Sequence, residues 1–212
     1  MSNGVHPYAG LIAFSVKLLS GTRARWFNCE PDARQRIYFA NHTSHLDLVV
    51  LWAALPPEIR AATRPVAAKD YWTKANFRRY FATTVFRAVL VDRPEAVNGG
   101  GALAGRVLLD PLIEAVDDGY SLILFPEGTR GDGCEVGRFR AGLYYLLHLR
   151  PNLEAVPVYL ENLNRVLPKG AILPAPVISR VTFGPPLRPY DGEDKDTFLD
   201  RARDAVLSLR NV

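Results

Sequence analysis

The chain contains a histidine and an aspartate at a spacing that suits proton transfer. An apolar run, residues 37–40, leads into the hexapeptide His42-Thr43-Ser44-His45-Leu46-Asp47. On one continuous helix, side chains five residues apart point about 140° away from each other, so His42 and Asp47 would not meet. A strand that ends near the histidine and turns into a helix brings them together. We predict such a corner, with Ser44 as the helix N-cap and Asp47 reaching back toward the imidazole.

A histidine that is oriented by a carboxylate can act as a general base. Asp47 would hold the Nδ1–H group of His42, which leaves Nε2 free to take a proton from a substrate hydroxyl. Acyl transfer from a thioester to an alcohol fits this pair. The alcohol needs a base, whereas a simple thiol has a pKa of about 8.5 and its thiolate leaves without an acid. Two alternatives stay open from this box alone: Asp47 closes a capping box with Ser44, and His42 is an ordinary turn histidine.

A second polar motif follows another short apolar run. Residues 121–124 lead into Phe125-Pro126-Glu127-Gly128-Thr129-Arg130. The motif therefore begins at the carboxyl end of a predicted strand, which is the edge where open α/β sheets bind ligands. Glu127 can accept from a hydroxyl group, Gly128 permits a close backbone approach, and Arg130 offers a guanidinium that suits phosphate. The alternative is a solvent-exposed loop in which Glu127 and Arg130 pair with each other.

Two further segments have the character of strands. Residues 86–91 form an apolar run whose exit carries Arg93, a cation that a phosphate ligand could use. An exposed pair of Arg93 with Asp92 is the alternative. Residues 154–160 are rich in β-branched residues but contain Pro157, which predicts an edge strand, a bulge, or a point where the backbone leaves the ladder.

These four segments, in this order and at these separations, resemble the four blocks of the glycerolipid acyltransferase family. The best-known members of this family are the 1-acylglycerol-3-phosphate acyltransferases of the PlsC type. The matching residues are 41–47, 91–93, 125–130 and 156–158. The resemblance extends over about residues 36–190, and the first and third blocks together make it specific. Gly131 stands where the family often has serine, which leaves the identity of the acceptor open.

The resemblance implies roles for individual residues. His42 would be the catalytic base and Asp47 its orienting partner. The residues implied to hold the phosphorylated acceptor are Arg93, Glu127, Gly128, Thr129 and Arg130, with Asn41, Ser44 and Pro157 in support. The implied reaction moves a fatty acyl group from acyl-CoA or acyl carrier protein to the free hydroxyl of 1-acylglycerol-3-phosphate, and gives phosphatidic acid. No metal and no cofactor are expected.

Other functions compete with this interpretation. The acceptor could be another lysolipid, such as a lyso-ornithine lipid, or the chain could be a peripheral lipid-binding protein without turnover. Hydrolysis of the thioester, with water in place of the acceptor, is a third possibility. A serine hydrolase of the α/β type is disfavoured because the sequence contains no G-x-S-x-G pentapeptide.

The composition predicts a single domain. The 212 residues are 48% hydrophobic and 23% charged, and strand-like runs alternate with helical ones. We predict strands near 36–40, 65–68, 86–91, 121–125, 154–160 and 178–184. We predict helices near 45–54, 71–83, 102–117, 139–149 and 196–209, with Pro111 kinking or dividing the third. This alternation favours an α/β fold, with a mixed, largely parallel sheet of about six or seven strands covered by helices on both faces.

The sequence also indicates where the protein works. No apolar stretch approaches 18 residues, and two cysteines give no disulfide framework, so we expect a cytoplasmic protein. Residues 8–19 could form an amphipathic helix that lies in a membrane interface or packs on its own domain. Residues 69–93 interleave basic and aromatic side chains, which suits an anionic lipid surface. Nucleic acid is not an expected partner, because the net charge is only +4 and no nucleic-acid module is visible.

Overall fold

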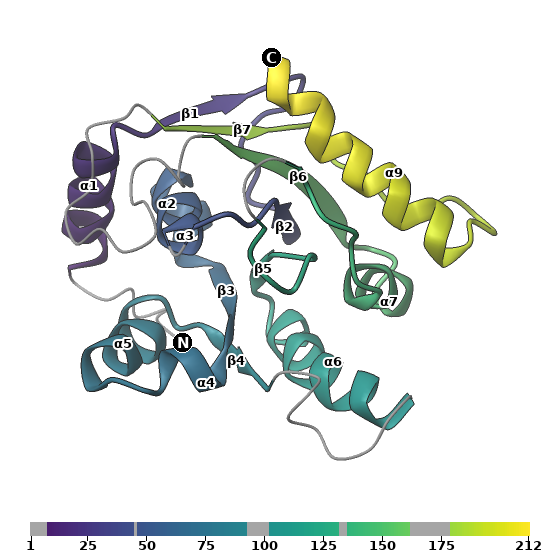
Figure 1. Cartoon of the computed structure of the whole chain (residues 1–212), viewed down its shortest axis with the longest axis horizontal. Coiled ribbons are helices and arrows are strands. Elements are labelled where there is room, and N and C mark those ends of the chain that lie inside the picture. Colours follow the sequence, from purple (N-terminus) through teal and green to yellow (C-terminus); the bar gives the residue numbers. More distant parts are fainter. Residues whose placement is uncertain (1–7, 45, 93–101, 132–134, 162–178) are drawn as a thin grey trace.

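The computed structural model describes residues 8–44, 46–92, 102–131, 135–161 and 179–212. Within them, seven strands form one sheet in the order β1-β7-β6-β2-β5-β3-β4 (Figure 1). The strands are β1 (Arg23–Trp26), β2 (Arg36–Ala40), β3 (Thr63–Ala68), β4 (Val89–Val91), β5 (Ser121–Leu124), β6 (Glu154–Glu161) and β7 (Arg180–Phe183). Among these seven strands of the described residues, β6 and β7 form the one antiparallel pair. The predicted α/β fold with a largely parallel sheet is confirmed.

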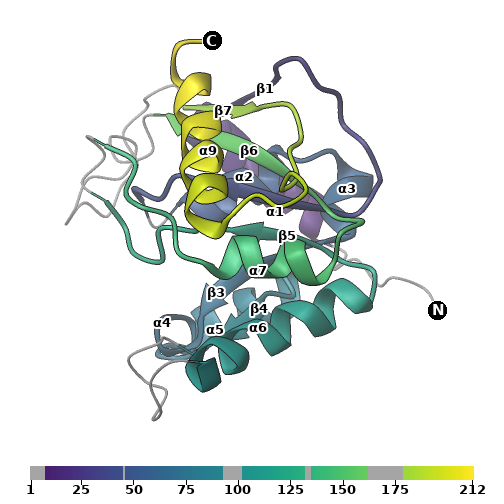
Figure 2. The ribbon, with the colours of Figure 1, turned by 90° about the vertical axis from the view of Figure 1, so that its right-hand side faces the viewer.

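Helices cover both faces of this sheet. One face is covered by α1 (Ala9–Ser20), α2 (Asp47–Ala54) and α3 (Pro57–Ala61), and the other by α6 (Ala102–Asp117), α7 (Gly142–Leu149) and α9 (Lys195–Ser208). Figure 2 shows α6, α7 and α9 on the near side of the sheet and α1 and α2 behind it. Shorter elements are α4 (Lys69–Trp72), α5 (Asn76–Tyr80), the π-helical turn η1 (Phe81–Val85) and the 3-10 turn η3 (Leu209–Asn211). No helix in the described part of the chain is long and apolar enough to cross a membrane.

The central strand β2 links the two halves of the core. Tyr38 and Ala40 belong to the cluster on the α1 and α2 face, whereas Ile37 and Phe39 belong to the cluster on the α6, α7 and α9 face. All four side chains are fully buried. A parallel strand covered on both faces needs apolar residues at every position, which explains the continuous run in the sequence. The residues that follow β2 therefore leave from a rigid support.

Two expectations about the elements were wrong in detail. Residues 71–83 do not form one helix, because Ala75 is extended, with φ −131° and ψ 138°, and separates α4 from α5. The strand predicted over 86–91 begins only at Val89, since η1 is followed by Arg87 with φ 49°, a conformation incompatible with a strand. The missed strand, β1, is a sheet edge with mostly exposed side chains, so it has no apolar pattern.

For each of the two prolines inside predicted elements, the structure excludes one of the expected alternatives. Pro111 does not divide α6, which continues from Ala102 to Asp117. Pro157 lies in β6, which is a central strand between β2 and β7 rather than an edge strand. The carbonyl of Pro157 accepts the N–H of Gly184 at 2.9 Å. The missing N–H of the proline faces the same side, just beyond the last β6–β7 pair of Val158 with Phe183, which agrees with the expected point where the backbone leaves the ladder.

Candidate active site

His42 and Asp47 meet where β2 ends and α2 begins. The Nδ1 atom of His42 lies 2.8 Å from Oδ2 of Asp47. The Asp47 side chain is fully buried, whereas 22% of the His42 side chain is exposed. The contact that the spacing predicts is therefore present, with the carboxylate shielded and the imidazole open to a substrate.

The Asp47 carboxylate also organises the turn that precedes α2. Its Oδ2 atom accepts the backbone N–H groups of Thr43 at 2.6 Å and Ser44 at 2.8 Å. The prediction that Ser44 is the N-cap is wrong, because the helix begins at Asp47 and the N-cap position is Leu46. The Ser44 hydroxyl accepts from Leu46 N at 3.2 Å instead. One of the two hydrogen bonds of the alternative capping box, from the Ser44 N–H to Asp47, is therefore present. The same carboxylate oxygen also holds His42.

This arrangement fixes the tautomer and the orientation of the His42 imidazole. Oδ2 of Asp47 accepts two backbone N–H groups, so it is also the acceptor toward His42, whose Nδ1 donates. Nε2 is then the nitrogen that can accept a proton. The ring of Phe125 stacks on the imidazole at a centroid distance of 4.4 Å, which restricts rotation of the ring.

Glu127 holds the backbone of His42 in place through hydrogen bonds. Its Oε1 atom accepts the N–H of His42 at 2.7 Å, and its Oε2 atom accepts the N–H of Gly137 at 2.8 Å. The N–H of Gly131 donates to the carbonyl of His42 at 2.8 Å. Glu127 is only 8% exposed, and both of its oxygens have backbone donors. This geometry favours a positioning role over the acceptor contact that the sequence suggested.

Arg140 is a residue of this edge that the sequence reasoning missed. Its Nε atom donates to the carbonyl of Glu127 at 3.3 Å, and its backbone N–H donates to Pro126. Gly128 has φ 72°, and a Cβ atom there would lie 2.5 Å from Arg140 Nε. Gly128 is therefore needed for both its backbone conformation and the passage of the Arg140 side chain. A cavity of about 580 Å³ adjoins Glu127 and Arg140.

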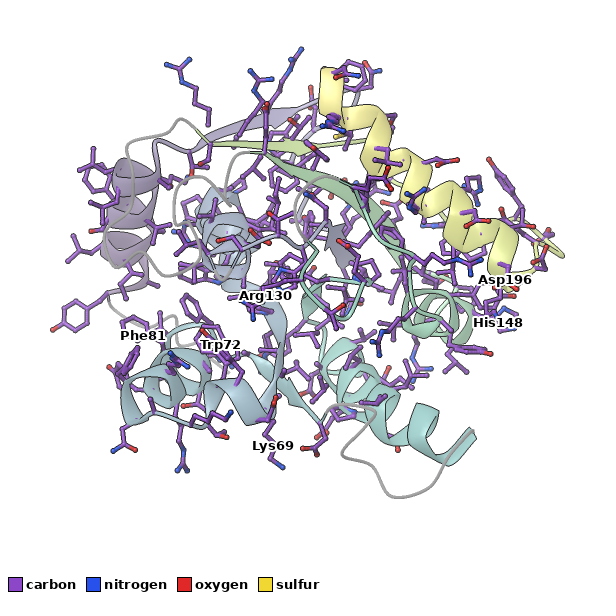
Figure 3. All side chains as sticks on the ribbon, in the orientation of Figure 1. Lys69, Trp72, Phe81, Arg130, His148 and Asp196 are labelled. Atoms are coloured by element: carbon purple, nitrogen blue, oxygen red, sulfur yellow. The ribbon has the colours of Figure 1, made fainter. Side chains whose placement is uncertain are left out.

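The remaining predicted site residues fall into three groups. Thr129 and Arg130 are exposed, and Figure 3 shows Arg130 close to β2 and β5. Asn41 supports the site, because its side chain donates to the carbonyl of Leu160 at 3.0 Å and accepts the Leu160 N–H at 2.8 Å, which ties the end of β2 to β6. Arg93, together with His45 of the first motif, lies outside the described residues. Among the described residues, no group of His, Cys, Asp and Glu has the arrangement of a metal site.

Comparison with known proteins gives the same family as the motifs. A family model described as Acyltransferase matches residues 28–161. Two curated relatives, the 1-acyl-sn-glycerol-3-phosphate acyltransferases of Limnanthes alba and Limnanthes douglasii, are each 26% identical over 206 residues. Each match covers 97% of this chain and 67% of the relative.

A solved structure supports the fold. The crystal structure of PlsC, the 1-acyl-sn-glycerophosphate (LPA) acyltransferase from Thermotoga maritima, matches with a TM-score of 0.72 and 18% sequence identity. The match covers 96% of this chain and 77% of that chain. Since the family model covers well over half of the chain, including the His42 and Glu127 motifs, the chain belongs to the acyltransferase family.

Proposed function

We propose that this acyltransferase moves a fatty acyl group from acyl-CoA or acyl carrier protein to the free hydroxyl of 1-acylglycerol-3-phosphate, and forms phosphatidic acid. The single observation that carries the proposal is the 2.8 Å contact between His42 Nδ1 and Asp47 Oδ2 at an open edge of the sheet. The names of the two curated relatives support this acceptor.

In the proposed reaction His42 moves one proton. Nε2 removes the proton of the acceptor hydroxyl as that oxygen attacks the thioester carbonyl. A C–O bond forms, the C–S bond breaks, and the electron pair of the broken bond leaves on sulfur as a thiolate. The imidazolium then returns the proton to this sulfur, which yields the free thiol. Asp47 stabilises the imidazolium between the two proton transfers, and no covalent enzyme intermediate is needed.

The acceptor phosphate needs positive charge beside this base. We assign Arg130 to this task, because it follows β5, the direct neighbour of β2, and a guanidinium can bind phosphate through two parallel hydrogen bonds. Arg93 has the same proposed role on the basis of the family motif. Glu127 is a positioning residue that holds His42 through the backbone. We propose that the reaction needs no metal or cofactor, because a thiolate is a good leaving group and the dyad supplies the base.

We also propose that the protein associates peripherally with an anionic membrane surface. α1 buries Ala9 and Ala13, each 2% exposed, against its own domain, yet its outer face is apolar as well. The exposed apolar residues of α1 are Leu11, Phe14, Leu18 and Leu19, at 63–70% exposure. An apolar stripe of this kind on a short helix suits the boundary between lipid headgroups and acyl chains. The packing option for residues 8–19 therefore holds for one face of the helix, and we propose the interfacial option for the other.

The basic and aromatic segment after β3 divides in the same way. Trp72 packs toward the core, on the side of α4 that faces α2 in Figure 3, and its ring lies 6.1 Å from that of Phe86. Phe77 and Tyr80 on α5 are 63% and 49% exposed. The exposed rings add to the proposed lipid-facing surface, and the buried ones hold the segment in place.

Product analysis tests the proposed function. The purified protein is incubated with labelled acyl-CoA, with and without 1-acylglycerol-3-phosphate, and the lipids are separated. We expect label in phosphatidic acid only when the acceptor is present. Release of free fatty acid without acceptor would indicate a hydrolase, and no turnover would indicate a lipid-binding protein. A parallel series of lysolipids, including a lyso-ornithine lipid, identifies the preferred acceptor.

A further inference from the structure

A second pocket lies at the edge of the sheet opposite to His42. It has a volume of about 360 Å³, within the range of ligand sites. Its lining comes from the first turn of α1, the end of α2, α3, the start of β3 and the end of η1. Thr63, at the start of β3, is in register with Ser121, at the start of β5, and β5 runs parallel to β2. The pocket therefore lies at the amino ends of the strands, whereas the dyad lies at their carboxyl ends.

The charge of the pocket is unbalanced. Its lining contains three arginines, Arg60, Arg64 and Arg87, against one carboxylate, that of Glu58. In the described part of the chain, none of the three guanidinium groups forms an ion pair with a carboxylate. Partly buried cations usually have an anionic partner, so the pocket has the character of an anion site.

Two of the arginines meet on one aromatic ring. The guanidinium of Arg64 lies 3.4 Å from the ring centroid of Tyr120, and Arg87 Nη2 donates to the Tyr120 hydroxyl at 3.0 Å. Hydrogen bonding from Arg64, and secondarily from Arg87, lowers the pKa of Tyr120. The Nε atom of Arg64 is buried and has no hydrogen-bond partner among the residues that the structure describes. Arg87 also has φ 49°, a strained conformation of the kind that occurs at ligand sites.

Within the described ranges, the third arginine, Arg60, has no short hydrogen bond to a side chain. The guanidinium of Arg60 lies 5.2 Å from the Trp52 ring and donates only long hydrogen bonds, 3.5 Å to the carbonyl of Ala53 and 3.4 Å to that of Leu55. Burial lowers the pKa of Arg60. Burial, and secondarily the charge of Arg60, lowers the pKa of Lys17. A bound anion would relieve this repulsion between neighbouring cations.

Apart from its charged residues and Thr63, the lining of the pocket is apolar. Trp52, Val85 and Phe86 are at most 4% exposed, and the rings of Trp52 and Phe86 meet edge to face at 5.0 Å. A site with several guanidinium groups and an apolar wall suits an amphiphile with a negative head. The first turn of α1, which begins at Ala9, forms another part of the wall, and the outer face of the same helix carries the exposed stripe that includes Phe14.

We propose that this pocket binds the phosphate headgroup and first methylene groups of an anionic membrane phospholipid, at a site separate from the acceptor site. The pocket deepens the proposed function, because it would hold the enzyme on an anionic bilayer beside α1. Its occupant is a lipid that the reaction does not consume. Binding therefore does not require His42, and the proposal stands or falls independently of turnover.

The test measures binding of a soluble lipid to the full chain by calorimetry. The probe is dihexanoyl phosphatidylglycerol below its micelle concentration, which is neither substrate nor product of the proposed reaction. Dihexanoyl phosphatidylcholine and inorganic phosphate are the comparison ligands. We expect phosphatidylglycerol to bind at least about tenfold more tightly than either, because it alone combines the net charge with the apolar chains. Equal binding of phosphatidylcholine, or of inorganic phosphate, would overturn the proposal.

The variants locate the binding. The double variant Arg64→Gln/Arg87→Gln is expected to weaken phosphatidylglycerol binding about tenfold or more. Its matched control, Arg180→Gln/Arg188→Gln, removes the same charge from exposed arginines outside the pocket and should bind normally. Arg130→Ala, at the opposite edge, should also bind normally. A loss in either control, or none in the double variant, would contradict the assignment.

A variant that leaves the charge unchanged tests the pocket independently of the arginine substitutions, which could also disturb the fold. Ala61→Phe reduces the space of the pocket and leaves the arginines in place. We expect it to weaken phosphatidylglycerol binding. The preference of the acyl-transfer reaction for one acyl-chain length over another should stay unchanged. If Ala61→Phe instead shifts the chain-length preference and leaves phosphatidylglycerol binding unchanged, the pocket is part of an acyl-chain site and the proposal is wrong.

Discussion

The two edges of the sheet differ in how their charged groups are paired. At the carboxyl edge, Asp47 and Glu127 are buried and their bonds go to His42 and to backbone N–H groups of neighbouring loops. At the amino edge, Arg64 and Arg87 line a pocket in which no carboxylate pairs with them among the described residues. The first edge is preorganised by its own residues, which suits chemistry. Among the described residues, the arginines of the second edge contact the Tyr120 ring but no carboxylate, which suits the binding of an anion.

The largest effect tests the preorganised edge. Asp47→Asn should lower kcat about 10³- to 10⁴-fold, because an amide does not hold the Nδ1–H tautomer or stabilise an imidazolium as a carboxylate does. Steady-state rates with acyl-CoA and lysophosphatidate measure it, and circular dichroism checks the fold. A rate within tenfold of the parent would mean that the dyad is not the source of the activity.

Glu127→Gln sharpens the difference between positioning and binding. Only one oxygen remains to accept the two N–H groups of His42 and Gly137, so the loop that carries His42 should shift. We expect kcat to fall about 10²-fold, as a misplacement of about 1 Å causes, with little change in the KM of the acceptor. The converse result, a raised acceptor KM at normal kcat, would restore Glu127 to the acceptor contact that the sequence suggested.

Arg130→Ala probes charge at the same edge. Loss of one guanidinium should raise the KM for a phosphate-bearing acceptor about tenfold, because a hydrogen bond to a charged group contributes about 1.5–3 kcal/mol. The KM for acyl-CoA should change far less. Equal changes in both constants would remove the headgroup assignment.

The last effect concerns the exposed face of α1, which lies outside the pocket and away from the dyad. Phe14→Asp places a charge on the exposed apolar face and should weaken binding to anionic vesicles by about tenfold, since burial of one large side chain contributes about 1.5–3 kcal/mol. Tyr190→Asp is the matched control, because Tyr190 is similarly exposed, at 67% against 64% for Phe14. Vesicle sedimentation reports both. If the two variants sediment alike, α1 has no special role at the membrane.

Much of the fold was predictable because burial leaves a pattern in the sequence. β2, β5 and β6 are apolar since helices cover both of their faces, and the predicted strands there agree closely with the structure. β1 was missed because an edge strand is held by backbone pairing with β7 and needs no apolar side chains. The interruption at Ala75 was missed because a local backbone conformation decides it.

The candidate site was predictable where its residues are close in sequence. His42 and Asp47 lie within one turn, so their spacing carried the signal. The tasks of Ser44 and Glu127 depend on which backbone N–H groups come near, and this is set by tertiary packing that a sequence does not display. The pocket at the amino edge could not be predicted, since Arg60 and Arg87 come from separate elements and form no motif.

The central claim is that His42 is the base for acyl transfer. The most direct measurement is the rate at which His42→Ala transfers label from acyl-CoA to lysophosphatidate, with circular dichroism and lysophosphatidate binding measured on the same protein. The account predicts a loss of at least about 10³-fold with the fold and acceptor binding retained. A folded His42→Ala protein that transfers acyl groups at near the parent rate would contradict it.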